Sequence, residues 1–370
     1  MRIIYGVSGE GSGHSSRAKQ MARHLLGAGH EVLFVSYNRG YAALHSHFPC
    51  HEIEGLRIIS VNNRVSMWRT LLYNLKKLPA FLRSIKSLRA VFNEFQPDVV
   101  ISDFEPMTAR FASARHLPLI SLDNQHRMRY MDYDSPSHLR MERWFTERVI
   151  CWVIPKPDVS LATTFLMGPV KNANTFLFPP ILREEVGATQ PSLGSHHLVY
   201  VTGHYDSLIE TLRSFRDERF IVYGYNKDEV SGNLYFKQFS TVGFLEDVAS
   251  SQSIIATAGF TLMSEAMYLQ KPYLAFPMHG QFEQQLNAFC LVELGFGQNA
   301  QNADRETLED FFAQLPRYAE ALSQYANGYS NNPLALDNVE ICAKLDELLA
   351  NDASVLRQHQ KGAREKLMGE

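Results

Sequence analysis

The sequence has 370 residues, of which 45% are hydrophobic and 20% are charged, a composition typical of a folded globular protein. This length is sufficient for two domains, each with a hydrophobic core of its own. The formal net charge of −3 argues against general nucleic-acid binding, because proteins that neutralise phosphates usually carry a basic balance.

Cysteine usage and the apolar pattern place the protein in a cellular compartment. The four cysteines are far apart and form no CxxC pair and no cluster with histidine, so we expect reduced thiols and no metal site. The sequence opens directly on a strand-like segment, and no apolar run approaches the roughly 18 to 20 residues of a spanning helix. We therefore expect a cytoplasmic protein.

The first half of the sequence alternates short apolar runs with helical patterns. Strands are expected at Ile3–Val7, Glu31–Ser36, Asp98–Ser102 and Leu119–Leu122, and helices at Ser15–Gly27 and about Met107–Arg115. Such alternation predicts a parallel sheet that is covered by helices on both faces.

A second series of the same kind follows a turn-rich stretch near residue 180. Strands are expected at His197–Thr202, Phe220–Tyr225, Phe239–Val242, Ser253–Ala256 and Tyr273–Phe276, and helices at Tyr205–Ser214, Thr261–Gln270 and Phe282–Leu294. From about Arg305 the pattern is helical and polar. The sequence thus predicts an α/β protein with two doubly wound domains, residues 1–180 and 181–325, and a helical segment, residues 326–370.

A glycine-rich loop, residues 8–14 (SGEGSGH), follows the first expected strand. Glycines at a strand-to-helix turn let the backbone approach a ligand, and the start of the helix favours an anion. A dinucleotide fingerprint would place its third glycine one position later, and it would require an acidic residue at the end of the second strand. We therefore expect no nicotinamide cofactor.

His14 ends this loop, and Asp103 ends a later expected strand. The carboxyl ends of parallel strands share one edge of the sheet, so Asp103 is expected beside His14, where it would orient the imidazole and stabilise the imidazolium. A neutral His14 at a helix start can accept a proton from a hydroxyl group. The alternatives are that each residue merely caps its own helix.

The loop and this pair resemble the acceptor side of GT-B glycosyltransferases. His14 and Asp103 match, in order and spacing, a histidine and an aspartate of plant-type UDP-glycosyltransferases. The resemblance implies a GT-B fold, in which two Rossmann-like domains face each other across a cleft. It also implies that residues 1–180 bind the acceptor, with an acceptor-side loop formed by Gly9, Glu10, Gly11 and Gly13.

The second half contains a more specific match, from Ala256 to Ala288. It resembles the donor site of the lipid-linked N-acetylglucosaminyltransferase of peptidoglycan synthesis and of the galactolipid synthases. The resemblance implies that residues 181–325 bind the nucleotide-sugar. The implied donor contacts are the turn Ala258, Gly259, Phe260 and Thr261 for the diphosphate, Glu265 for the ribose, Gln284 and Gln285 for the sugar with Asn287 as their support, Phe244 and Leu245 for the base, and Gly203 and His204 for the phosphates.

These resemblances imply an inverting hexosyltransferase that moves a sugar from a UDP-sugar to a hydroxyl group of an unknown glycan or lipid acceptor, as in cell-envelope glycan synthesis. No metal or cofactor is expected to be required. One alternative is a UDP-sugar epimerase of the same fold, although the glutamines at the expected sugar site argue against its elimination chemistry. Another alternative is a nucleotide-sugar-binding protein without catalytic activity.

Residues 64–90 form a basic and apolar stretch, with seven Lys or Arg and no acidic residue. A basic amphipathic helix can lie in an anionic membrane interface, here at the inner face of the membrane, with Pro79 as a kink or break. The other interpretation, which we favour from sequence, is a helix packed on its own domain with a solvated basic face.

Overall fold

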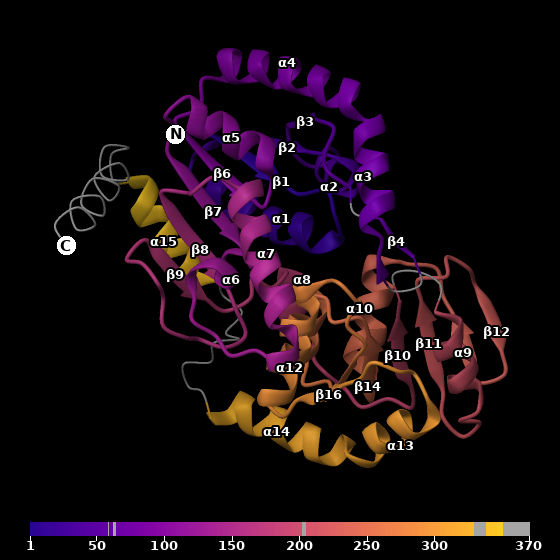
Figure 1. Cartoon of the computed structure of the whole chain (residues 1–370). Helices are drawn as coiled ribbons and strands as arrows, with labels where there is room; N and C mark the ends of the chain where they lie inside the picture. Colours follow the sequence, from indigo (N-terminus) through magenta and orange to yellow (C-terminus); the bar gives the residue numbers. More distant parts are fainter. Residues whose placement is uncertain (58, 62–63, 202–204, 329–337, 351–370) are drawn as a thin grey trace.

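The computed structural model describes residues 1–350 apart from 58, 62–63, 202–204 and 329–337. It contains two seven-stranded sheets and a two-stranded hairpin, β4 (Ser60–Val61) with β5 (Arg64–Val65). One sheet is built from residues up to Phe178 and the other from residues between His197 and Asn299. Figure 1 shows the two sheets as separate layered units with their helices around them.

The first sheet is entirely parallel and has the strand order β3-β2-β1-β6-β7-β8-β9. Its strands are β1 (Arg2–Val7), β2 (Glu31–Ser36), β3 (Cys50–Glu52), β6 (Val99–Asp103), β7 (Leu119–Asp123), β8 (Val159–Thr163) and β9 (Thr175–Phe178). The central strands β1, β6 and β7 are almost completely buried, as expected for a parallel sheet with helices on both faces.

Helices from both ends of the chain cover one face of the first sheet. They are α1 (Ser12–Gly27), α2 (Asn38–Leu44) and α15 (Val339–Ala350), whose apolar residues share one core cluster with the sheet. The opposite face is covered by α4 (Leu78–Phe95) and α5 (Pro106–Ala114). The C-terminal helix α15 therefore packs on the first half rather than extending beyond the second, and His24 of α1 bonds Asp346 at 2.8 Å.

The second sheet has the order β12-β13-β11-β10-β14-β15-β16 and is parallel except for the β12–β13 edge pair. Its strands are β10 (His197–Tyr200), β11 (Phe220–Tyr223), β12 (Glu229–Ser231), β13 (Leu234–Phe236), β14 (Ser253–Ala256), β15 (Tyr273–Ala275) and β16 (Gly297–Asn299). Helices α9 (Asp206–Arg213), α13 (Arg305–Ala313) and α14 (Leu315–Gly328) lie on one face. Helices α10 (Thr241–Ser250), α11 (Phe260–Tyr268) and α12 (Phe282–Glu293) lie on the other.

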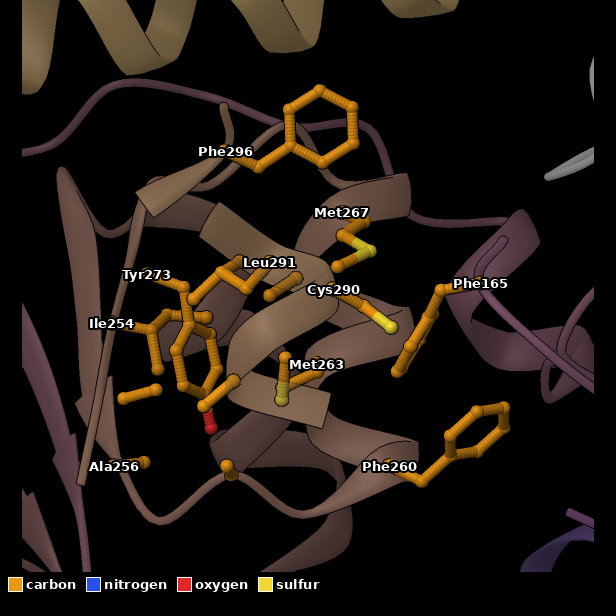
Figure 2. Close-up of a cluster of buried hydrophobic side chains, with 14 of the residues drawn as sticks. Phe165, Ile254, Ala256, Phe260, Met263, Met267, Tyr273, Cys290, Leu291 and Phe296 are labelled. Atoms are coloured by element: carbon orange, nitrogen blue, oxygen red, sulfur yellow. The ribbon is translucent and has the colours of Figure 1, made fainter. Parts of the chain in front are cut away.

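The two halves share one hydrophobic cluster. Met128, Leu139, Ile150 and Phe165 of the first half belong to the cluster that fills the space around α11 and α12. Figure 2 shows Phe165 pointing toward Cys290 and Phe260 from the ribbon of the first half. The segment that contributes these residues also contains α6 (His126–Tyr130), a short 3-10 turn (Ser137–Leu139) and α7 (Arg140–Val153), and α8 (Glu184–Gly187) follows β9.

Several expected elements differ from the structure. The strand expected at Phe239–Val242 is absent among the described strands; Ser240 instead caps α10, since its side chain accepts a hydrogen bond from Gly243 N. The first helix begins three residues earlier than expected, at Ser12, so His14 lies within its first turn.

The basic stretch of residues 64–90 is not one helix. It contains the end of the hairpin, then α3 (Met67–Lys76), and then the first part of α4. Pro79 lies in the first turn of α4, where its missing N–H leaves no helical hydrogen bond unmade. Pro79 is therefore at a break between helices, one of the two options that the sequence left open. In the described part of the chain, no helix is both long and apolar enough to cross a bilayer.

Candidate active site

The loop after β1 brings His14 to the carboxyl edge of the first sheet. Residues 8–11 connect β1 to α1, and Ser8 N bonds Asp103 O at 3.0 Å, so the loop is attached to the end of β6. Gly11, the N-cap of α1, has φ 82°, a left-handed conformation that favours glycine. This turn places His14 in the first helical turn, directly above the neighbouring strand end.

His14 and Asp103 form a close pair, as the sequence predicts. His14 Nδ1 lies 2.6 Å from Asp103 Oδ1, and only 13% of the His14 side chain is exposed, whereas Asp103 is fully buried. The parallel register of β1 and β6, with Val7 opposite Asp103, produces this proximity. An ionised Asp103 can only accept hydrogen bonds, so in the neutral imidazole Nδ1 carries the proton and Nε2 keeps its lone pair.

Arg17 is a third member of the group, which the glycine-rich loop and the strand ends did not reveal. Its Nε and Nη2 donate to Asp103 Oδ2 and Oδ1 at 2.8 and 2.6 Å, and Nη2 also lies 3.2 Å from His14 Nδ1. Arg17 is buried, and it stands three residues after His14 on the same face of α1. That i, i+3 spacing was the available signal.

The charges around Asp103 determine its protonation state. Complete burial by itself raises the pKa of Asp103, but Arg17 and His14, through their charges and hydrogen bonds, outweigh burial and hold that pKa below its ordinary value of 3.8. The aspartate is therefore an anion at neutral pH, and it can stabilise a positive charge that develops on the imidazole.

The loop glycines make close contacts inside the protein. A Cβ atom at Gly9 would lie 2.0 Å from Tyr37 O, and a Cβ atom at Gly13 would lie 2.4 Å from Thr261 Oγ1. At Gly11 the space is open. Gly13 is therefore the point at which the start of α1 meets the start of α11, in the opposite half. Glu10 is partly buried at the edge of this loop.

The start of α11 is the expected diphosphate turn. Gly259 is the N-cap of α11 and no side chain caps this helix, so its first backbone N–H groups are not satisfied by a cap. A Cβ atom at Gly259 would meet nothing within 4 Å, and its φ of −72° is accessible to any residue. Among the described residues, nothing inside the protein therefore explains a glycine at this position.

The other expected donor residues have partners within the protein. Glu265 is buried and receives two hydrogen bonds from Arg183, at 2.7 and 2.9 Å. Gln284 Oε1 accepts from Met278 N at 3.0 Å, and the buried Gln285 lies 3.4 Å from Gln301. The structure thus places Glu265 and Gln285 mainly in internal contacts.

The residues expected at the nucleotide base lie in a helix and do not follow a strand. Phe244 and Leu245 are buried in α10, where Phe244 packs edge-on against Tyr223. The strand expectation was wrong because the Ser240 cap starts a helix there. Gly203 and His204 lie outside the described residues.

Phe260 and Asn287 connect the donor turn to the first half. The guanidinium of the buried Arg127 lies over the rings of Phe260 and Phe165, 5.1 and 5.7 Å from their centroids, and it hydrogen-bonds Asn287. Asn287 Nδ2 donates to Ala258 O at 2.8 Å. Asn287 therefore supports the turn rather than the glutamines.

A carboxylate of α12 also reaches the first half. Glu283 accepts hydrogen bonds from Asn124 Nδ2 at 2.7 Å and from Gln125 Nε2 at 3.1 Å. No sequence pattern identifies Glu283 or Arg127, because their partners lie about 160 residues away. Within the part of the chain that the structure describes, no three His, Cys, Asp or Glu side chains are arranged to hold a metal ion.

Comparisons with known proteins agree with this architecture. A protein of Methanosarcina acetivorans named an uncharacterised glycosyltransferase is 25% identical over 323 residues, which cover 80% of this chain and 85% of the relative. The solved spinosyn forosaminyltransferase SpnP has a TM-score of 0.64 at 15% identity, covering 95% of this chain and 100% of that one.

A second solved structure, spinosyn rhamnosyltransferase SpnG complexed with thymidine diphosphate, has a TM-score of 0.62 at 14% identity and covers 92% of this chain and 99% of that one. These similarities show that the fold is the GT-B glycosyltransferase fold. A family model described as glycosyl transferase family 1 matches residues 1–316. The chain therefore belongs to glycosyl transferase family 1.

Proposed function

We propose that this glycosyltransferase uses a nucleoside diphosphate sugar, with a UDP-sugar as the first donor to test, and transfers the sugar to a hydroxyl group with inversion. The observation that carries the proposal is the approach of two helix starts from opposite halves. The start of α1 holds the His14–Asp103 pair, and the start of α11, beside Gly13, presents uncapped N–H groups. The proposed base and the proposed diphosphate site would thus lie on either side of one contact.

The proposed reaction is a single displacement. The acceptor oxygen attacks the anomeric carbon, its proton passes to His14 Nε2, and the bond between the anomeric carbon and the diphosphate oxygen breaks. The leaving nucleoside diphosphate keeps the electron pair, and the N–H groups and helix dipole at the start of α11 stabilise its negative charge without a required metal. Asp103 stabilises the imidazolium that forms.

The choice of nucleotide rests on the diphosphate rather than on the base. The rhamnosyltransferase structure that resembles this chain is complexed with thymidine diphosphate. A thermal-shift panel of UDP, TDP, GDP and their sugars tests the choice, because a ligand that binds only the folded state raises its melting temperature. We expect at least one nucleoside diphosphate to raise Tm. No shift with any of them contradicts the proposed donor class.

The sugar-side residues make a sharper test of the donor. We expect Gln284→Ala to weaken binding of the nucleotide-sugar more than binding of the bare nucleotide, because its amide is proposed to contact hydroxyl groups. Gln285→Ala, at the adjacent buried position, should likewise weaken binding of the nucleotide-sugar more than binding of the bare nucleotide. Equal losses for both ligands indicate that the glutamines support the fold rather than the sugar.

Catalysis distinguishes the transferase from the alternatives with the same fold. Slow hydrolysis of the donor that disappears in His14→Ala supports the base assignment and excludes a silent binding protein. Isomerisation of the sugar without release of the nucleotide would instead indicate an epimerase. Both outcomes are read by separating the nucleotide and sugar products after incubation with the wild-type protein.

We also propose contact with the inner, cytoplasmic face of an anionic membrane, which would suit a lipid acceptor. All three tryptophans are exposed, Trp68 on α3 and Trp144 and Trp152 on α7. Helices α4 and α7 are joined by α5: Arg115 bonds the carbonyl of Arg89, and Arg110 bonds that of Trp152. Residues of both helices contribute to the core cluster on one face of the first sheet; in Figure 1, α4 runs along the top and α7 runs from the middle toward α12.

The exposed faces of α3, α4 and α7 combine apolar and basic groups as interfacial proteins do. Their exposed apolar residues are Trp68, Leu71, Leu72, Leu75, Leu78, Leu82 and Ile85 on α3 and α4, and Met141, Trp144, Phe145, Val149 and Trp152 on α7. Aromatic side chains suit the headgroup region, and the basic residues suit anionic lipids. The proposed contact thus extends beyond residues 64–90 to α7.

Vesicle sedimentation tests the membrane proposal. The protein should pellet with phosphatidylglycerol-containing vesicles at low salt, less so as salt rises, and its tryptophan emission should shift to shorter wavelength. Trp68→Ser and Trp152→Ser should each reduce pelleting. Absence of pelleting at low salt would favour the other interpretation, in which these helices pack on their own domain and their exposed faces are solvated.

A further inference from the structure

A chain of hydrogen bonds runs from the His14 pair into the opposite half. Arg17, which holds both oxygens of Asp103, also directs Nη1 toward Asn124 Oδ1 at 3.4 Å. The other end of the Asn124 amide donates from Nδ2 to Glu283 Oε1 at 2.7 Å. Glu283 belongs to the first turn of α12, in the second half.

The amide of Asn124 is oriented by opposite charges at its two ends. Its oxygen faces the guanidinium of Arg17 and its nitrogen faces the carboxylate of Glu283, so a flipped amide would be unfavourable at both. Asn124 is 3% exposed and Arg17 is 5% exposed, so water competes little for these bonds. Arg17 is therefore linked, through Asn124, to a residue of the other half.

Arg17 and His14 share one oxygen of Asp103. Arg17 Nη2 and His14 Nδ1 both lie 2.6 Å from Oδ1. A shift of the guanidinium would change how this oxygen is divided between the two donors, and with it the direction of the imidazole. The fully buried carboxylate cannot restore the geometry by recruiting water.

We propose that Asn124 and Glu283 are positioning residues that orient the His14 base through Arg17 and Asp103. The base is then correctly directed only while α12 and the end of β7 are in contact. The inference rests on the proposed function, because it assigns His14 a proton to accept. It couples the contact between the halves to the geometry of proton transfer, where a displacement of about 1 Å can lower the rate on the order of 10²-fold.

Asn124→Ala is the principal test, and Gln125→Ala is its matched control. Gln125 donates to the same carboxylate, Glu283 Oε2, from the adjacent position, but it has no bond to Arg17. We expect Asn124→Ala to lower kcat about 10- to 100-fold, with KM for the donor and affinity for the bare nucleotide within about twofold. Gln125→Ala should lower kcat less than about threefold.

Two further variants separate positioning from a general loss of structure. Glu283→Gln keeps an acceptor oxygen for Asn124 and should retain more turnover than Glu283→Ala. In a His14→Ala background, Asn124→Ala should reduce the residual rate by less than about twofold, because its effect passes through His14. Equal losses in the Asn124 and Gln125 variants, or an undiminished Asn124 effect without His14, would overturn the proposal.

A substrate-free measurement keeps this inference separate from the proposed reaction. The proton of the His14 Nδ1–Asp103 hydrogen bond should give a downfield NMR resonance, assigned by its loss in His14→Ala. Asn124→Ala should shift or broaden it, whereas Gln125→Ala should leave it in place. If wild-type protein neither transfers nor hydrolyses any donor, the proposed function fails. This resonance still reports on the relay, the chain of hydrogen bonds from Glu283 through Asn124 and Arg17 to Asp103 and His14. A resonance unchanged in Asn124→Ala would overturn the relay itself.

Discussion

The starts of α1 and α11 face each other across the Gly13–Thr261 contact, and they present different chemistry. The first carries ionisable side chains, His14 with Asp103 and Arg17 behind it. The second has no side-chain cap, and it offers backbone N–H groups. A helix start can thus serve as a support for a reactive side chain or as an anion site in its own right.

The buried carboxylates near the two helix starts, Asp103 and Glu265, differ in the charges that surround them. Asp103 has two basic neighbours and a pKa below its ordinary value. Glu265 has one, Arg183, and burial, the largest influence, raises its pKa above the ordinary value of 4.5 despite that cation. The first carboxylate is held ionised between His14 and Arg17, whereas the second is a buried carboxylate that is paired with Arg183 alone.

The strongest test of the comparison is His14→Ala. We expect turnover to fall roughly 10²- to 10⁴-fold with nearly unchanged donor affinity, because base catalysis acts only in the transition state. Asp103→Asn should do no more harm than this, and adding it to His14→Ala should cost little more. Steady-state kinetics with the donor identified by thermal shift provide the measurement. Full turnover in His14→Ala would leave Glu10 as the next candidate base.

The ion pair between Arg183 and Glu265 of α11 is expected to stabilise the folded protein. Arg183→Met leaves Glu265 buried without its cation and should lower the free energy of unfolding by about 3–5 kcal/mol, measured by urea denaturation. Arg23→Met is the matched control: its half-exposed pair with Glu184 should contribute less than about 1 kcal/mol. Similar small effects in both variants would contradict a structural role for Glu265.

Glu265→Gln separates that structural role from ribose binding. If Glu265 holds the ribose, the variant should weaken nucleotide affinity by about 1.5–3 kcal/mol by calorimetry. The difference in stability between wild type and Glu265→Gln should also depend on pH. The raised pKa means that the contribution of Glu265 is present below pH 4.5 and is lost as pH rises through the folded-state pKa, so wild type gains on Glu265→Gln as pH falls.

The Asp103→Asn variant should show the opposite trend. Since the pKa of Asp103 is lowered, its stabilisation is present above pH 3.8 and is lost as pH falls through the folded-state pKa. The advantage of wild type over Asp103→Asn should therefore shrink in acid. Parallel trends for the two variants would mean that the carboxylates do not differ as described.

The Gly13–Thr261 contact is predicted to tolerate no added methyl group. Gly13→Ala places Cβ 2.4 Å from Thr261 Oγ1. The overlap should lower the free energy of unfolding by about 1–3 kcal/mol, or weaken the association of the two halves by a similar amount. Thr261→Ala removes that oxygen, so the double variant should recover most of the loss. Differential scanning calorimetry of the two single variants and the double variant checks this. No recovery would mean that the two helix starts do not meet in solution.

Gly259→Ala should have the smallest effect on the fold. Its backbone conformation suits alanine and its Cβ would meet open space, so stability should be unchanged or raised by about 0.4–1 kcal/mol. If a diphosphate binds this turn, the methyl group should nevertheless weaken nucleotide affinity by about 1.5 kcal/mol or more. Unchanged affinity by calorimetry would remove the turn from the donor site.

Local pattern and strand topology were sufficient for the framework and for one key contact. Buried strands such as Val99–Asp103 are recognisable from their continuous apolar residues. Because parallel strands end at a common edge of the sheet, the proximity of His14 and Asp103 could be predicted from the sequence. The edge strands β12 and β16 were not predicted, because a three-residue strand shows little periodicity. The start of α10 was mistaken for a strand at Phe239–Val242, because the Ser240 cap was not recognised.

The sequence by itself determined the doubly wound α/β architecture and the side chains at its strand ends, because both follow from short-range periodicity. Only the tertiary structure decided which cation binds Asp103, which carboxylate binds Arg183, and where Asn124 and Glu283 meet. The Asn124–Glu283 contact depends on how the two halves dock, because docking brings together residues about 160 positions apart that no local spacing relates. The Arg17–Asp103 pair instead depends on how α1 packs on the first sheet. The residues that link base and donor are therefore a property of the contact between the halves.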